Sequence, residues 1–137
     1  MQIHQSAEDY LETILMLNQR MGRVRSIDVV NELGYTKASV SIAMKKLREN
    51  GYIAVDGEGN LTLLEPGREI AERIYSRHRL LTHFFVQLGV DEEVAAEDAC
   101  KAEHILSEQT LKKIREYALL HDAEDSVQKS ERPSDFQ

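Results

Sequence analysis

Two short amphipathic segments near the start of the chain restrict its fold more than any other feature. Residues 26–33 carry apolar side chains at helical spacing and end at Gly34, and residues 36–50 repeat this pattern. Ser26 and Thr36 open the two segments, where a hydroxyl can accept a hydrogen bond from the free N–H groups of a first helical turn. Only about three residues separate the segments, and this spacing predicts a helix-turn-helix.

The stretch after these two helices predicts a β-hairpin. Residues 52–55 and 61–64 are short strand-like runs, and residues 56–60 between them are glycine, aspartate, glutamate and asparagine. A hairpin in this place is the wing of a winged-helix domain. Because residues 56–60 include acids and no bases, a strong contact between the wing and a phosphate backbone is not expected.

Helical patterns occupy most of the remaining chain. Helices are predicted over residues 7–19, 66–88, 91–106 and 107–120. Pro66 suits the first position of the long helix at residues 66–88. Asp91 and Ser107 can cap the helices that they precede.

The predicted fold is therefore mainly α. A winged helix-turn-helix domain covers residues 1–66, and the long helix joins it to an all-α domain at residues 67–120. From residue 121 the chain is polar and charged, with too few apolar side chains to pack, so residues 121–137 are predicted to form a disordered tail.

Charge and hydropathy limit the partners that the chain can have. The net charge of −7 does not by itself favour a nucleic acid, but residues 67–137, with 10 basic and 15 acidic side chains, are more acidic than residues 1–66, with 7 and 9. No apolar run is long enough to cross a bilayer, and the start lacks a signal-peptide pattern. We expect a cytoplasmic protein with no membrane partner. Its sole cysteine, Cys100, excludes an intrachain disulfide.

The second helix of the helix-turn-helix carries a basic, hydroxyl-rich face. Lys37, Ser41 and Lys45 recur at helical spacing opposite the apolar stripe, which suits entry into a major groove. The predicted DNA contacts are Arg25, Thr36, Lys37, Ala38, Ser39, Ser41, Lys45 and Arg48. The lysines alone would equally suit an ordinary solvated surface, and the helix-turn-helix and wing favour DNA.

Several side chains of metal-ligand type stand at helical spacing. Cys100, Glu103 and His104 lie at i, i+3 and i+4, so a thiol, a carboxylate and an imidazole would share one helical face. Asp9 and Glu12 are also spaced i, i+3. His78 falls within the long helix. A lone helical cysteine is more often a buried small hydrophobe, but six ligand-type residues on three helices favour a metal site.

Three motifs in colinear order resemble the diphtheria-toxin-repressor family. They are SAEDYLE at residues 6–12, RHRLL at residues 77–81 and DACKAEHILS at residues 98–107, with the helix-turn-helix and wing between the first two. The resemblance covers about residues 5–118 and fits the short, MntR-like form without a C-terminal barrel domain. It implies a cytoplasmic, dimeric, metal-activated DNA-binding regulator that represses metal-uptake genes and carries its dimerisation and metal-binding functions in the second domain.

The resemblance also implies a ligand set. Asp9, Cys100, Glu103 and His104 match the activating metal site of the family, and Glu12 and His78, with Glu103 shared, match a neighbouring second site. Manganese-responsive members pair the aspartate with a glutamate at the position of Cys100, and iron-responsive members pair the cysteine with a methionine at the position of Asp9. This chain combines the two types.

The soft thiol at Cys100 tips the expected metal slightly toward Fe(II) over Mn(II). Co(II), Zn(II) and Cd(II) are also expected to bind in vitro.

Two other classes of protein compete with this interpretation. A di-iron enzyme would need Glu-x-x-His on two helices, and no glutamate of this chain has a histidine three residues later, so we expect no enzyme activity. The alternative regulator responds to an organic ligand, with the polar cluster serving only helix packing. A homodimer with a double-stranded DNA operator is expected, built on apolar residues of the last two helices: Ala95, Ala99, Ala102, Ile105, Leu106, Leu111 and Ile114.

Overall fold

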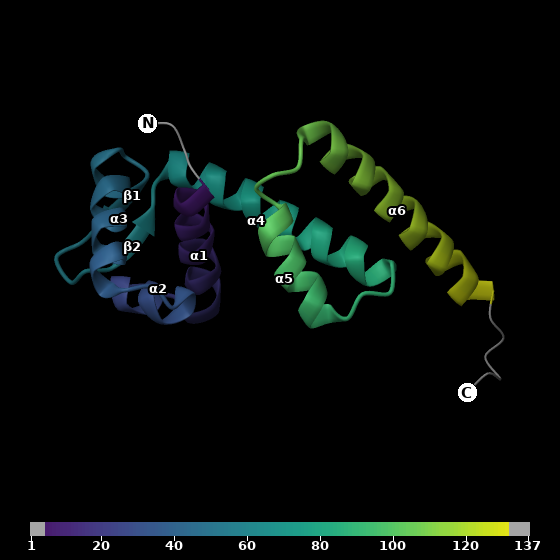
Figure 1. Cartoon of the computed structure of the whole chain (residues 1–137), viewed down its shortest axis with the longest axis horizontal. Coiled ribbons are helices and arrows are strands. Elements are labelled where there is room, and N and C mark those ends of the chain that lie inside the picture. Colours follow the sequence, from purple (N-terminus) through teal and green to yellow (C-terminus); the bar gives the residue numbers. More distant parts are fainter. Residues whose placement is uncertain (1–4, 132–137) are drawn as a thin grey trace. The chain divides into compact units, whose positions relative to one another are not determined.

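The computed structural model describes residues 5–131, and the side chains of residues 5–123. These residues form six helices and a two-stranded sheet (Figure 1). The elements are α1 (Gln5–Met21), α2 (Ser26–Leu33), α3 (Lys37–Glu49), β1 (Ile53–Val55), β2 (Leu61–Leu63), α4 (Glu65–Gln87), α5 (Glu92–Ala102) and α6 (Glu108–Glu131). The mainly α fold is as predicted. None of the described helices is both long and apolar enough to cross a membrane.

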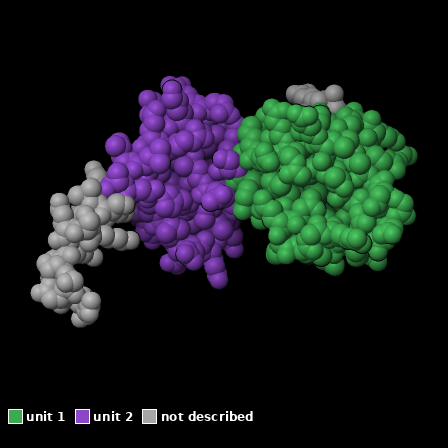
Figure 2. Space-filling model, turned by 180° about the vertical axis from the view of Figure 1, so that it is seen from behind, with its two compact units in different colours: residues 1–75 green, residues 76–137 purple. Residues whose placement is uncertain are grey.

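The chain divides into two compact units, Met1–Tyr75 and Ser76–Gln137, coloured green and purple in Figure 2. The division falls inside α4, beyond the boundary at residue 66 that the sequence suggests. The first part of α4 belongs to the first unit because Ile70, Ala71 and Tyr75 pack with its core. Arg73 of α4 also pairs with Glu8 of α1, at 3.4 Å between nitrogen and oxygen.

The core of the first unit joins α1, the helix-turn-helix and the hairpin. Leu11 and Ile14 of α1 are fully buried, as are Val29 of α2 and Val40 of α3, and Ile53 of β1 is 1% exposed. In the three helices, these buried residues stand at the positions that the helical spacing of the apolar residues predicts. Packing of these residues fixes α3 with its polar face outward.

The caps of α2 and α3 differ in how well the sequence predicts them. Thr36 caps α3 as expected, since its hydroxyl accepts from the N–H of Ser39 at 3.1 Å. The prediction that Ser26 caps α2 is wrong, because Ser26 is already helical and Arg25 is the N-cap residue. The N–H of Arg25 donates to Asp28 Oδ2 at 2.9 Å, so the carboxylate in the first turn of α2 holds the N-cap residue in place.

The wing forms where the sequence predicts it. β1 and β2 pair antiparallel, with Ile53 opposite Leu63 and Val55 opposite Leu61. An isolated bridge between Arg25 and Asn60 ties the loop before α2 to the base of the wing. The wing is therefore held to the helix-turn-helix by backbone pairing as well as by its buried leucines.

The second unit contains the rest of α4 with α5 and α6. Leu81, Ala99 and Leu111, one from each helix, form its buried centre. Ser107 caps α6 as predicted, because its hydroxyl accepts from the N–H of Thr110 at 3.1 Å.

Two predicted helix ends in this unit are wrong. α5 ends at Ala102 rather than near Leu106, because the N–H of Ile105 turns back to the carbonyl of Ala102, three residues earlier, and closes a tighter turn. α6 continues through Glu131 instead of giving way to a disordered tail at residue 121. Residues 121–131 contain no glycine or proline, so nothing in the backbone stops the helix. Residues 132–137 of the predicted tail lie outside the described residues.

Gly67 provides a test of the packing between the wing and α4. A Cβ at this position would overlap the carbonyl oxygen of Tyr52 and press on Leu11, so Gly67→Ala should lower the free energy of unfolding by about 1–3 kcal/mol. Urea denaturation followed by circular dichroism measures this. Gly57→Ala is the matched control, because nothing lies within 4 Å of its added Cβ. Equal stability of the two variants would contradict the packing.

Candidate nucleic-acid interface and metal centre

The exposed face of α3 carries the predicted DNA contacts. Val40, Met44 and Leu47 are buried on the opposite side. All eight residues predicted to contact DNA are exposed: Arg25, Thr36, Lys37, Ala38, Ser39, Ser41, Lys45 and Arg48. The Thr36 hydroxyl donates to Ser39 Oγ at 2.9 Å, so two of the predicted hydroxyls are already paired to each other at the helix start.

The wing is organised by one carboxylate. Asp56 Oδ1 accepts from the N–H groups of Glu58 and Asn60, both at 2.9 Å, and Asp56 Oδ2 accepts from Asn60 Nδ2 at 3.0 Å. These hydrogen bonds, the one from the Asn60 side chain above all, hold the pKa of Asp56 below its usual value. The turn therefore contains a stabilised negative charge, which agrees with the expectation of a weak phosphate contact here.

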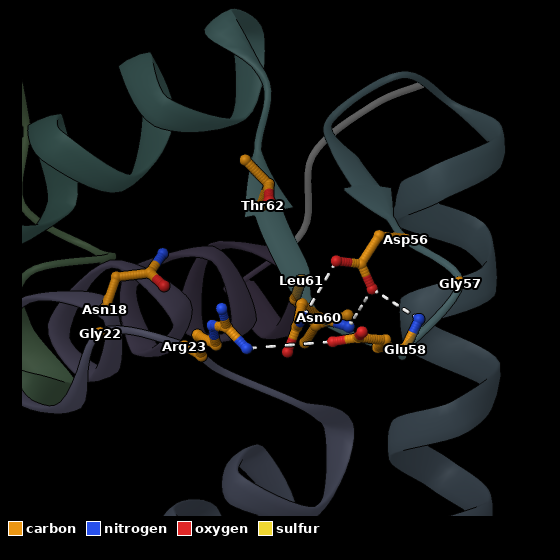
Figure 3. Close-up of a pocket in the computed structure, with 9 residues that line it drawn as sticks. All are labelled: Asn18, Gly22, Arg23, Asp56, Gly57, Glu58, Asn60, Leu61 and Thr62. Atoms are coloured by element: carbon orange, nitrogen blue, oxygen red, sulfur yellow. Dashed lines mark hydrogen bonds and ion pairs between the residues drawn. The ribbon is translucent and has the colours of Figure 1, made fainter.

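An open hollow of about 590 Å³ lies beside the wing (Figure 3). Arg23 at its edge approaches Glu58 to 3.9 Å between nitrogen and oxygen, and both side chains are largely exposed. Such exposed pairs contribute little to stability. The arginine does, however, partly offset the acidic charge of the wing.

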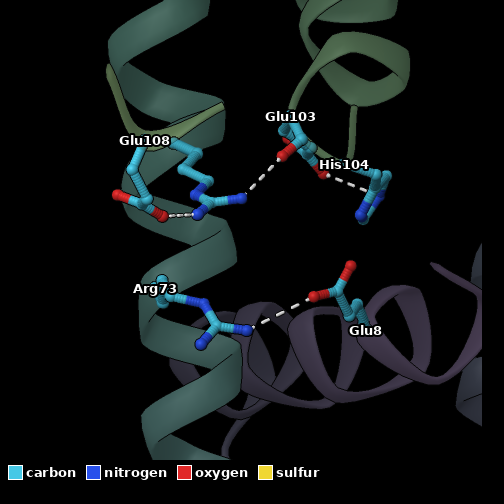
Figure 4. Close-up of polar contacts among 6 residues, drawn as sticks. Glu8, Arg73, Glu103, His104 and Glu108 are labelled. Carbon is cyan, nitrogen blue, oxygen red and sulfur yellow. Dashed lines mark hydrogen bonds and ion pairs between the residues drawn. The ribbon is translucent and has the colours of Figure 1, made fainter. Parts of the chain in front are cut away.

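A carboxylate–imidazole cluster forms within the second unit. Glu103, fully buried directly after α5, contacts two histidines. His78 Nδ1 of α4 lies 3.0 Å from Glu103 Oε2. His104 Nε2 lies 3.4 Å from Glu103 Oε1, and Figure 4 shows this second pair. The side chains of the two histidines are 20% and 1% exposed, respectively. A buried carboxylate with an imidazole at each oxygen is a set of donors that suits a divalent transition metal.

Arg77 holds this cluster from the backbone side. Its guanidinium donates to the carbonyl oxygen of Glu103 at 3.2 Å and also pairs with Glu108 at the start of α6. One arginine thus links α4, the turn after α5 and α6. Sequence analysis did not single out Arg77, although it stands next to His78 in the second motif.

The other predicted ligands occupy different surroundings. Asp9 and Glu12 lie one turn apart on α1, with Asp9 partly buried and Glu12 only 5% exposed. Cys100 lies on α5 and is exposed. The structure of the second unit therefore brings together His78, Glu103 and His104. Because α5 ends at Ala102, Glu103 and His104 lie in the turn that follows rather than on one helical face with Cys100.

Among the described residues, more of the exposed large apolar side chains lie in the second unit than in the first. Its exposed large apolar residues are Val86, Leu88, Val94, Ile105, Tyr117, Leu119 and Leu120. Of the residues predicted for a dimer contact, Ile105 is 76% exposed, whereas Ala95, Ala99 and Leu111 are buried. Ala99 and Leu111 are buried because they form the unit's own core.

A winged helix-turn-helix and a separate helical unit with a carboxylate–imidazole cluster together define a metal-responsive DNA-binding regulator. Family models match both parts: the iron dependent repressor N-terminal DNA binding domain over residues 2–61, and the iron dependent repressor metal binding and dimerisation domain over residues 64–127. The chain belongs to the iron-dependent repressor family, that of the diphtheria toxin repressor and of MntR, whose members are metal-dependent transcriptional regulators.

Curated relatives match over most of their length. An uncharacterised HTH-type transcriptional regulator of Methanocaldococcus jannaschii is 35% identical over 113 residues, which are 81% of this chain and 90% of the relative. The HTH-type transcriptional regulator MntR of Bacillus subtilis is 32% identical over 124 residues, 90% of this chain and 87% of the relative. Both relatives are named as transcriptional regulators, and neither as an enzyme.

Solved structures show the same fold in longer proteins. A manganese-dependent transcriptional repressor, solved in complex with manganese, is 28% identical with a TM-score of 0.75, and the match covers 82% of this chain. IdeR of T. acidophilum is 23% identical with a TM-score of 0.75, covering 85% of this chain. This chain spans only 52% and 55% of the length of these two proteins.

The lowered pKa of Asp56 predicts how the wing responds to acid. A depressed pKa means that the charged carboxylate stabilises the turn above the pKa of an unfolded aspartate, and that this contribution is lost as the pH falls through the folded pKa. Carbon-13 NMR titration should find Asp56 ionising below an ordinary aspartate, and Asn60→Ala should raise its pKa. Thr62→Ala, an exposed change on β2, should leave it unaltered. If the pKa of Asp56 in the Asn60→Ala protein stayed as low as in the wild type, this would contradict the role of Asn60.

Proposed function

We propose that this protein is a cytoplasmic, homodimeric repressor of metal-ion uptake genes that binds its operator when loaded with Fe(II) or Mn(II). The observation that carries the proposal is the buried Glu103 with an imidazole at each carboxylate oxygen. Burial of a carboxylate is costly unless cations or hydrogen-bond donors surround it. A divalent ion would meet this need better than the two histidines alone.

The residues that would hold the metal come from both family domains. We assign His78, Glu103 and His104 from the second unit, together with Asp9 and Glu12 of α1 and Cys100 of α5, as the ligand set. Four of these residues match the activating site of the family, and we propose that they form it here: Asp9, Cys100, Glu103 and His104. A bound ion supplies positive charge and fixed coordination, so ligand binding would order the helices that carry the ligands. Arg77 would keep the Glu103 backbone in place during this change.

The choice of metal depends on the pairing of Asp9 with Cys100. Carboxylate oxygen favours Mn(II) and Fe(II), and thiolate sulfur disfavours Mn(II) relative to Fe(II), Co(II) or Zn(II). We therefore propose Fe(II) ahead of Mn(II).

The homodimer would be formed by the second unit. Leu119 and Leu120 on α6 are 62% and 64% exposed, and Ile105 is 76% exposed, so a partner copy would remove a substantial apolar area from water. A twofold dimer presents two α3 helices, which matches an operator of two related half-sites.

Removal of metal tests the regulator directly. With Mn(II) or Fe(II) in the buffer, the protein should bind a preferred duplex selected from a random pool, and a chelator should weaken this binding at least tenfold if metal orders the DNA-binding form. Electrophoretic mobility shift or fluorescence anisotropy measures the change. Chelator-independent binding would instead favour a regulator that responds to an organic ligand.

Substitution of Cys100 tests the metal preference. Cys100→Glu should shift the response toward Mn(II) relative to Fe(II), because a hard carboxylate replaces a soft donor. Wild-type protein loaded with Co(II) should show a sulfur-to-metal charge-transfer band in the near ultraviolet, and Cys100→Ala should lose it.

Ser107→Ala, near Cys100 in sequence but assigned only to capping α6, should keep the band and serves as the control. A Cys100→Ala protein that retains full metal-triggered DNA binding would remove the thiol from the ligand set and favour Mn(II).

A further inference from the structure

One apolar side chain on α3 is exposed where the fold gives no reason to expose it. Of the large apolar side chains of α3, all of which the structure describes, Val40, Met44 and Leu47 are buried and Ile42 is 58% exposed. Helical spacing places Ile42 one turn after Ala38 and three residues before Lys45, in the middle of the face that points away from the core.

The surroundings of Ile42 combine apolar walls with cations. Two open hollows have Ile42 as a common wall, one of about 280 Å³ and one of about 340 Å³. Ala43 and Leu47 also line the first, with Lys46 at its edge. Lys45 and Arg48 border the second. An occupant of this surface must therefore present negative charge around a small apolar group.

The major groove of DNA offers this combination. Phosphates line both sides of the groove, and the C5-methyl of thymine is the one apolar group that the four base pairs present there. Lys45, Lys46 and Arg48 are exposed around Ile42 and can approach phosphates while Ile42 faces the bases. A protein partner would be expected to need a wider apolar patch than one isoleucine ringed by three cations.

We propose that Ile42 contacts the C5-methyl of a thymine and thereby selects a T·A base pair at one position of each operator half-site. This inference rests on the proposed DNA-binding function and adds a base preference to it. Cytosine lacks the methyl group, and the purines place a ring nitrogen at that edge of the groove, so each of the three other bases loses the contact.

The experiment replaces the methyl group alone. The metal-loaded wild-type protein selects a duplex from a random pool, and each thymine of that duplex is then changed in turn to deoxyuridine, which lacks only the C5-methyl. We expect one thymine in each half-site at which this change weakens wild-type binding about fourfold, the effect of about 0.8 kcal/mol for one buried methyl. Ile42→Ala should bind the thymine duplex more weakly by a similar factor and should not respond to deoxyuridine at that position.

Ile27→Ala provides the matched control. Ile27 is also an exposed isoleucine, 43% accessible, but it lies on α2. Its alanine variant should keep the wild-type sensitivity to deoxyuridine, and circular dichroism should show equal folding of both variants.

An Ile42→Ala protein that keeps the wild-type deoxyuridine penalty at every thymine would overturn the assignment, and so would a wild-type protein insensitive to every methyl. In either case metal-dependent binding of the selected duplex would still uphold the proposed function. Failure to bind any duplex with metal present would overturn both.

Discussion

The buried carboxylate of Glu103 is the constraint on which the second unit depends. Its position directly after α5 exists because the helix ends at Ala102 and the chain turns back within three residues. Arg77 holds the backbone of Glu103 from α4, and the histidines at positions 78 and 104 meet the two carboxylate oxygens. A longer α5 would place Glu103 and His104 on the surface of a helix and would move Glu103 away from His78. The early end of α5 therefore helps to form the carboxylate–imidazole cluster at which we propose that the metal binds.

The first unit divides its charge between two surfaces. The wing is acidic and is stabilised as such by the hydrogen bonds to Asp56, whereas the exposed face of α3 has three lysines and an arginine. Because a phosphate backbone is repelled by the first surface and attracted by the second, we expect α3 to provide most of the DNA contact. Arg23 and Arg25, which border the wing, reduce the repulsion at its base. This distribution explains how a protein of net charge −7 can bind DNA.

The sequence predicted the elements better than their ends. The helix-turn-helix, the wing, the long α4 and the caps at Thr36 and Ser107 follow from local patterns, because hydrogen bonds within one turn decide them. Arg25 rather than Ser26 is the N-cap residue, and its backbone N–H donates to the carboxylate of Asp28 in the first turn. The prediction ended α6 at residue 120 because the residues that follow are too polar to pack. Helix propensity does not require packing, so a polar segment without glycine or proline can continue the helix.

By itself, the sequence determined the class of fold and the family, and it supplied the residues of the proposed metal site, because helical periodicity and colinear motifs are properties of neighbouring residues. Only the tertiary structure decided that His78 and Glu103, 25 positions apart, meet at 3.0 Å, that Ala99 and Leu111 serve the unit's own core, and that Ile42 stays in solvent. The physical reason is that burial depends on which distant segments pack together. A pattern with a period of about four residues gives the face of a helix but not what covers it.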